Sequence, residues 1–166
     1  TAHFTKYYGY CEGEKLKSFI ENLLIKKNLK KDITFEKLYE DKNEDKEKKF
    51  KKDLNFIGSN ISFAKQEIFS LKTTPNMKIA EAVLISASYP FVFPLKNLNS
   101  EKGKKNIVYC DGGLINNYPI RIFDLDGKPN PETLGFKLSI KSSVIHKEKK
   151  IKGVFDLLKQ ITSLLL

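Results

Sequence analysis

The sequence is poor in residues that build several common kinds of site. It has no tryptophan, and only two cysteines and two histidines among 166 residues. Two cysteines, Cys11 and Cys110, form neither a disulfide framework nor a cysteine-rich metal centre, and a reducing compartment fits them. The histidines, His3 and His146, lie far from any motif. These shortages exclude small disulfide-stapled folds and cysteine- or histidine-rich metal domains.

Long apolar runs are missing as well. No uninterrupted stretch approaches the length of a membrane span, and the opening "TAHFTKYYGY" has no apolar core of a secretory signal. With 40% hydrophobic and 30% charged residues, the chain reads as a soluble globular domain with a sizeable core. The sequence begins at Thr1 rather than at an initiator methionine, so we expect it to be a piece of a longer protein.

Arginine is nearly absent although the chain is basic. The net charge is +10 with 30 lysines and arginines, and Arg121 is the sole arginine. Readout of base edges favours arginine, and no recognition motif or stacking pattern is present, so no nucleic-acid partner is expected. A lysine-rich face suits an anionic surface such as acidic lipid. Alternatively, these lysines only solvate the surface.

What is present is an alternation of helix and strand patterns. Thr34 and Asn76 are suitable N-caps for the second and third helices, and Pro90 ends the third. Strands separated by helices predict an α/β fold, a three-layer sandwich around a mainly parallel sheet. Helices are expected over 13–28, 35–39, 76–89 and 153–166, strands over 54–63, 66–71, 107–110 and 135–140, and loops over 40–53 (highly charged) and 91–106. The inward face of the third helix is expected to carry the side chains of Ile79, Ala80, Val83, Leu84 and Ala87.

The segment "YCDGGLINNYP", residues 109–119, contains the candidate site. Asp111 follows a short apolar strand, and functional residues of α/β domains collect where strands end. Gly112 and Gly113 can adopt a positive φ and allow other backbone to approach closely. An aspartate placed there can orient or deprotonate a nucleophile. The alternative is an Asp-Gly turn without chemistry.

The surroundings of this turn resemble a known family. "KIAEAVLISASYPFVFPLKN" followed by "YCDGGLINNYPIRIF" resembles the C-terminal half of patatin-like lipid acyl hydrolases. The family's helix after the nucleophile is similar to "YYGYCEGEKLKSFIENLL". A short segment that follows it is similar to "ITFEKLYE", and the family's central strand pair is similar to "LNFIGSNISFAKQEIFS". The resemblance therefore covers nearly the whole chain.

The resemblance implies a Ser–Asp dyad. In the family, the serine lies in a G-x-S-x-G elbow, and a glycine-rich loop supplies the oxyanion hole. Asp111 matches the base that activates the serine, and Gly112 and Gly113 complete its motif. The implied activity is phospholipase A-type hydrolysis of a phospholipid or other acyl-ester lipid, with transient contact to a membrane surface. No metal or organic cofactor is implied.

The sequence lacks two motifs of the family pattern. It contains no G-x-S-x-G, because in "GSNIS" Ser59 directly follows Gly58, and it has no glycine-rich oxyanion loop. Both belong before Thr1 in the family. Residues 1–166 are therefore expected to be the C-terminal part of one patatin-like catalytic domain, incomplete at its N-terminus, inactive alone and partnered by the N-terminal remainder. The alternative is a non-catalytic patatin-like scaffold that binds lipid or a protein.

Other residues near the motif have structural explanations. Ser86 and Ser88 are expected to be small packing residues that let the helix approach the sheet. Tyr89, Phe91 and Phe93 either line an acyl-chain pocket or pack in the core.

Overall fold

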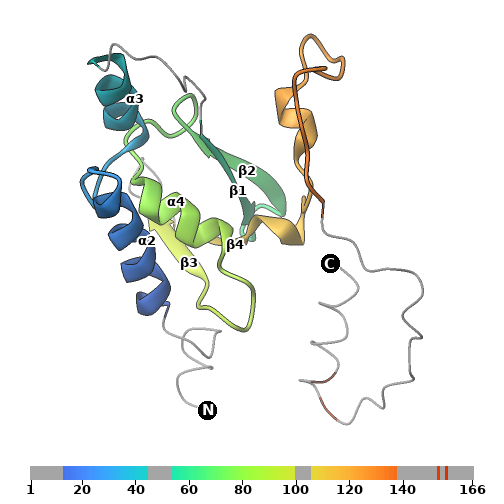
Figure 1. The fold of residues 1–166 in the computed structure, drawn as a ribbon. Coiled ribbons are helices and arrows are strands. Elements are labelled where there is room, and N and C mark those ends of the chain that lie inside the picture. The colour runs from blue at the N-terminus through green and yellow to red at the C-terminus, as the bar shows by residue number, and fades with distance from the viewer. Residues whose placement is uncertain (1–12, 45–53, 100–105, 138–152, 154–155, 157–166) are drawn as a thin grey trace. The chain divides into compact units, whose positions relative to one another are not determined.

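A computed structural model describes residues 13–44, 54–99, 106–137, 153 and 156 (Figure 1). The chain divides into two units, residues 1–115 and 116–166, and each is described by itself. Of the predicted helix over 153–166, only residues 153 and 156 are described, and the charged segment 45–53 lies outside the described residues. The predicted strand over 135–140 is wrong for residues 135–137, which have no regular secondary structure, and residues 138–140 lie outside the described residues.

The first unit is built on a four-stranded sheet with the order β2-β1-β4-β3 (Figure 1). Its pairings β1–β2, β1–β4 and β3–β4 are all antiparallel. The strand predictions over 54–63, 66–71 and 107–110 are confirmed, with changed ends. The strands are β1 (Asn55–Asn60), β2 (Lys65–Ser70), β3 (Lys96–Asn99) and β4 (Asn106–Asp111).

The α/β class is confirmed, but the described residues do not confirm a mainly parallel sheet or a three-layer sandwich. Only residues 61–64 join β1 to β2, and parallel neighbours need a much longer crossover. Ala64, with φ at 50°, helps to close this hairpin. Strand β3 was missed, because its sequence "KNLN" has no apolar run and lies in the predicted loop 91–106. Its pairing with β4 holds these residues in a strand, which their own sequence does not indicate.

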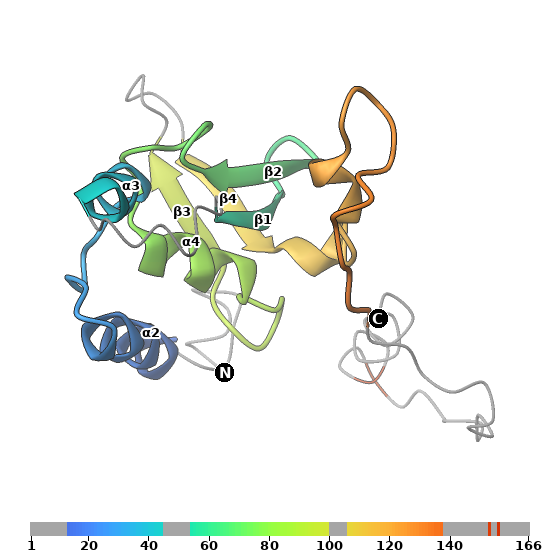
Figure 2. The ribbon, with the colours of Figure 1, turned by 45° about the horizontal axis from the view of Figure 1, so that its top comes forward.

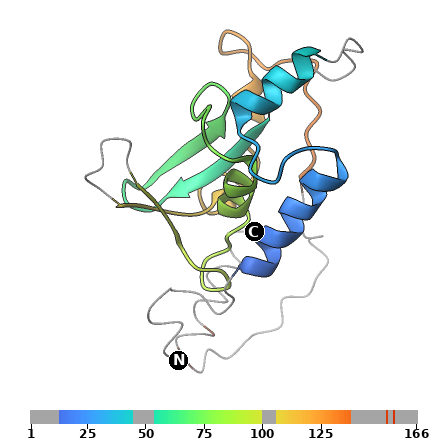
Figure 3. The same cartoon turned by 90° about the vertical axis from the view of Figure 1, so that its left-hand side faces the viewer.

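The described residues of this unit form the α-helices α2 (Glu14–Lys26), α3 (Phe35–Glu44) and α4 (Ile79–Ser86). Helix α4 contacts β1 and β4 on one side and α2 on the other, and Figures 2 and 3 show it between the sheet and α2. Ala82 and Ile85 are fully buried in the cluster under the sheet, while Ala80 and Leu84 pack with Ile20 of α2. The predicted inward stripe omitted Ala82 and Ile85, because a helix covered on two sides has no single apolar stripe.

The starts of α3 and α4 differ in how they are capped. Thr34 caps α3 as predicted, with its Oγ1 accepting from Lys37 N at 3.3 Å. The helix extends to Glu44, so the predicted loop over 40–53 is wrong for residues 40–44. The proposed Asn76 cap is also wrong, because α4 begins at Ile79 after Lys78 and has no side-chain cap.

A neighbouring segment of backbone replaces the missing cap of α4. Ile79 N donates to Ile33 O at 3.0 Å, and Phe35 N donates to Met77 O at 3.3 Å. The first turns of α3 and α4 therefore satisfy each other's free N–H groups, which a helix start otherwise leaves to a side chain or water. Such pairing between distant segments leaves no sign in the local sequence.

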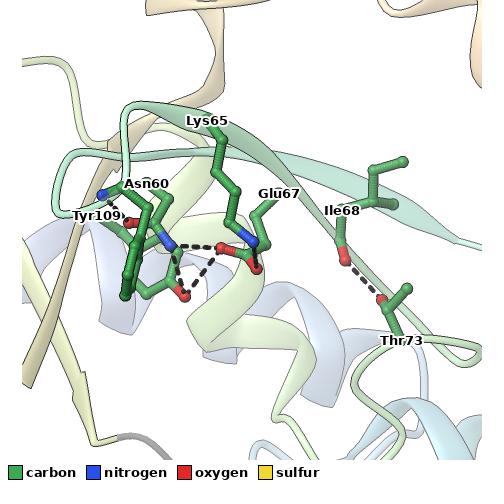
Figure 4. A network of polar contacts seen from close by, with 7 residues as sticks. Asn60, Lys65, Glu67, Ile68, Thr73 and Tyr109 are labelled. Carbon is green, nitrogen blue, oxygen red and sulfur yellow. Dashed lines mark hydrogen bonds and ion pairs between the residues drawn. The ribbon is translucent and has the colours of Figure 1, made fainter. Parts of the chain in front are cut away.

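A polar network joins the three neighbouring strands β2, β1 and β4 (Figure 4). Glu67 Oε2 of β2 accepts from Asn60 Nδ2 of β1 at 2.6 Å and from the hydroxyl of Tyr109 of β4 at 3.2 Å. Lys65 Nζ lies 3.2 Å from Glu67 Oε1. Burial, and then the Glu67 charge, raise the pKa of Tyr109 to about 12. The phenol therefore stays protonated and keeps donating, which fixes β4 two residues before Asp111.

The first prediction concerns Gly58, in the middle of the sheet. A Cβ at this position would lie 2.6 Å from Phe69 Cε2 and 3.2 Å from Ile85 Cγ2. Phe69 is only 1% exposed, so its ring has no free space to move into. We expect Gly58→Ala to lower the free energy of unfolding by roughly 1–3 kcal/mol. Urea denaturation of the full-length protein, with an unchanged m-value, measures this loss.

The control is Ala64→Gly in the turn of the same hairpin. This change removes the side chain from a residue with φ at 50°, which relieves strain in the folded backbone. It also increases the conformational entropy of the unfolded chain, which opposes that gain. Its stability should stay within about 1 kcal/mol of the parent. A denaturation midpoint for Gly58→Ala equal to that of the parent would contradict the close packing described.

Candidate active site

Strand β4 places Asp111 at the edge of the packed core. The strand is apolar from Ile107 to Cys110, and Tyr109 and Cys110 are 5% and 0% exposed. Asp111 is the last residue of β4 and pairs in register with Gly58 of β1. The predicted position at a strand end is confirmed. Asp111 is partly buried and does not lie on an exposed hairpin tip.

The carboxylate of Asp111 is held by its own turn. Its Oδ1 accepts a hydrogen bond from Gly113 N at 2.7 Å, which caps the short 3-10 helix Gly112–Leu114. Desolvation by burial raises the pKa of Asp111 above its usual range, and the Gly113 hydrogen bond opposes that rise. A carboxylate with a raised pKa is a better base than an exposed aspartate. The backbone bond also fixes where its oxygens lie.

Gly112 is required because β1 lies directly against it. A Cβ on Gly112 would lie 2.2 Å from the carbonyl oxygen of Ile57 and 2.6 Å from its carbonyl carbon. Both atoms are backbone inside a paired strand, so neither can move aside. Gly112 does not adopt a positive φ, so that part of the sequence-based explanation is wrong for this residue. The close approach of backbone to backbone is confirmed.

The main chain of Asp111 bonds to two other segments. Its N–H donates to Ser88 O at 2.9 Å, just after α4. Its carbonyl accepts from Ser59 Oγ of β1 at 2.8 Å, and the same hydroxyl lies 3.5 Å from Gly112 O. Ser59 and Ser88 are both fully buried. The packing role expected for Ser88 fits this geometry. Sequence reasoning missed Ser59, for which the available signal was a polar residue inside an otherwise buried strand.

Cys110, beside Asp111, is a poor candidate for the nucleophile. Its thiol is fully buried, and desolvation, followed by the negative charge of Asp111, raises its pKa to about 11. A neutral buried thiol is unreactive. Among the described residues, no three histidine, cysteine, aspartate or glutamate side chains gather as metal ligands. The described helices include none that is both long and apolar enough to cross a bilayer.

A polar pocket of about 480 Å³ lies among α2, α4 and β3. Its walls carry both charge signs, including Glu14, Lys17, Glu81 and Lys96. Burial lowers the pKa of Lys96. Asp111 does not line this pocket.

In the second unit, the residues after the motif form tight turns. Asn116 Oδ1 accepts from Tyr118 N at 3.3 Å, the pattern of an Asx turn. A 3-10 helix, Ile120–Phe123, follows. The side chain of Asn116 therefore bonds the backbone of the turn that follows the motif.

Comparison with known proteins shows the family of the chain. Residues 3–124 match the model of the patatin-like phospholipase family. The chain belongs to this family. It is 31% identical over 119 residues to an uncharacterized protein of Acanthamoeba polyphaga mimivirus, and 32% identical over 115 residues to a probable lipid hydrolase of Invertebrate iridescent virus 6. These matches cover 72% and 69% of the patatin-like chain but 34% of each relative. The chain thus spans about a third of the length of the curated relatives it matches.

The buried carboxylate predicts a specific pH dependence of stability. Because the folded-state pKa of Asp111 is raised, the folded protein binds this proton more tightly than the unfolded chain does. The stabilisation from that proton is complete below the usual aspartate pKa, and it is lost as the pH rises through the raised value. Asp111→Asn, which removes the charge, should therefore raise the Tm at pH 7. The difference should shrink towards about pH 4, where the carboxyl becomes protonated.

Thermal melts of both proteins across this pH range check the sign. Asp126→Asn, at an exposed turn carboxylate, serves as the control and should leave the Tm unchanged at either end. If Asp111→Asn lowered the Tm equally at every pH, burial would not be the force acting on this carboxyl.

Proposed function

We propose that this chain is part of a lipid acyl hydrolase that works by a Ser–Asp dyad, with Asp111 as the base. The observation that carries the proposal is the partly buried Asp111 carboxylate at the end of β4, oriented by the Gly113 N–H at 2.7 Å. Membership of the patatin-like phospholipase family supports the reaction class, and the probable lipid hydrolase among its relatives agrees with it.

In the proposed mechanism, Asp111 removes the proton from the serine hydroxyl as the serine oxygen attacks the ester carbonyl. The tetrahedral intermediate then collapses, the alcohol leaves with that proton, and an acyl-enzyme remains. A water molecule, deprotonated by the same carboxylate, attacks the acyl-enzyme carbonyl, and the bond to the serine oxygen breaks. Asp111 returns the proton to the serine oxygen as the fatty acid leaves, which restores the enzyme. The substrate would be a phospholipid or another acyl-ester lipid.

The nucleophile is proposed to lie in the N-terminal remainder of the domain. The 166 residues contain no G-x-S-x-G, and the relatives are about three times as long as the matched part. That remainder would also add the parallel strands and the further helix layer of a complete three-layer sandwich. This segment alone would be inactive, since removing one member of a coupled unit removes most of the catalysis.

The membrane surface is the proposed place of action. The net charge of +10, carried almost wholly by lysine, suits attraction to anionic lipid without specific readout. Because the 166 residues lack the G-x-S-x-G motif, there is a second candidate function. It is a non-catalytic patatin-like scaffold that binds lipid or a protein partner. The activity test below separates the two.

The activity prediction concerns Asp111→Asn in the full-length protein. The amide keeps the size of the side chain and can accept from Gly113 N, but it cannot accept the serine proton. General-base help is worth roughly 10²- to 10⁴-fold in rate, and kcat should fall by that amount. Hydrolysis of a short-chain ester and of a phospholipid in vesicles is the measurement, with circular dichroism to confirm folding.

Asp124→Asn and Asp126→Asn are the matched controls, since both carboxylates follow the motif in "FDLDG", Asp124 at the end of the 3-10 helix Ile120–Phe123 and Asp126 in a turn. Their activity should stay within a few-fold of the parent. A folded Asp111→Asn protein with near-parental turnover on both substrates would exclude Asp111 as the base. A parent protein that binds vesicles but hydrolyses neither substrate would favour the scaffold.

A further inference from the structure

The backbone of Asp111 is fixed on both sides by fully buried serines. Its N–H donates to Ser88 O at 2.9 Å, and its carbonyl accepts from Ser59 Oγ at 2.8 Å. The hydroxyl of Ser59 also lies 3.5 Å from the Gly112 carbonyl. The two residues belong to different elements, so the turn that contains Asp111 is attached to both β1 and the end of α4.

The two attachments differ in what sustains them. Ser88 contributes its main-chain carbonyl, and its own N–H donates to Ile85 O at 3.0 Å while its hydroxyl donates to Leu84 O. The helix end therefore holds Ser88 whatever lies beyond it. On the β1 side the donor is the side chain of Ser59. A single substitution can remove that donor without deleting any main-chain hydrogen bond.

Ser59 also acts in a place that water cannot reach. Its side chain is 0% exposed, and the neighbouring contact of Gly112 with Ile57 leaves no space between β1 and the turn. Without the hydroxyl, the Asp111 carbonyl would keep only the weak contact with the Cys110 thiol at 3.8 Å, and it would turn towards a stronger donor. Rotation of the peptide between Asp111 and Gly112 would also shift the turn that follows, and with it the Gly113 N–H that bonds the Asp111 carboxylate, so the carboxylate would move as well.

We infer that Ser59 is a positioning residue, which sets the direction of the Asp111 carboxylate by donating to the Asp111 carbonyl. The inference rests on the proposed function, in which that carboxylate takes the serine proton. A base must lie within hydrogen-bond reach of the proton it removes, and a displacement of about 1 Å can cost roughly 100-fold in rate.

The experiment compares four variants of the full-length protein. Ser59→Ala removes the hydroxyl, and Ser59→Thr restores it. Ser70→Ala is the matched control, because Ser70 is also a buried strand serine (4% exposed) whose hydroxyl bonds Thr73 Oγ1 at 3.0 Å, in β2 rather than beside Asp111. Asp111→Asn is the reference for loss of the base.

Ser59→Ala should lower kcat for a short-chain ester roughly 10- to 100-fold and leave KM unchanged. Its looser turn should let water reach the carboxylate, so the acidic limb of the pH–kcat/KM profile should move to lower pH. Ser59→Thr should recover at least a third of the parental kcat with the parental profile. Ser70→Ala should match the parent in kcat and profile, whatever stability it loses.

The outcomes separate this inference from the function on which it rests. If Asp111→Asn retains parental turnover, the proposed base is wrong. If Asp111→Asn is inactive while folded Ser59→Ala has parental kcat and an unmoved acidic limb, the base stands and the positioning role of Ser59 is overturned. Should Ser59→Ala fail to fold, Ser59→Cys replaces it, because a thiol of similar size is a weak donor. Parental kcat in Ser59→Cys would overturn the inference equally.

Discussion

The contact between Gly112 and the Ile57 carbonyl is the constraint on which the rest of the site depends. With 2.2 Å from that oxygen to any Cβ, only glycine can follow Asp111. This approach brings the turn onto β1, so that a side chain as short as Ser59 reaches the Asp111 carbonyl. The same position leaves the Asp111 N–H facing the end of α4. One steric requirement therefore determines which segments support the carboxylate.

Burial affects the polar groups of this unit in two different ways. In the described part of the chain, every buried side-chain nitrogen or oxygen has a hydrogen-bond partner, and the Asn60–Glu67–Tyr109 network shows how a buried group is compensated. At Asp111 the compensation is incomplete, since one backbone N–H opposes the desolvation but does not cancel it. Proteins tolerate such a cost where function requires it. The fold therefore disfavours charge at the residue to which the proposed mechanism assigns proton transfer.

The sequence predicted the elements with clear local signals and missed those made by pairing. Apolar, β-branched runs marked β1, β2 and β4, and Thr34 marked the start of α3. Strand β3 exists because β4 lies beside it, and α4 starts without a side-chain cap because the segment around Ile33 satisfies its N–H. The parallel sheet was predicted from the order of helices and strands. Strand direction, however, depends on connection length, and the link between β1 and β2 is too short for parallel pairing.

The same distinction applies to the candidate site. Asp111, Gly112 and Gly113 are contiguous, so a motif reveals them and the resemblance to a family gives them a meaning. Ser59 and Asp111 are 52 residues apart, and their hydrogen bond exists only because β1 and β4 pair with Gly58 opposite Asp111. A shift of that register by one residue would turn Ser59 to the other face and break the bond. The Asp-Gly-Gly motif is therefore not a self-sufficient turn. It fixes the Asp111 carboxylate only while β1 pairs with β4, so the partly buried carboxylate lies at the end of a paired strand rather than in a free loop.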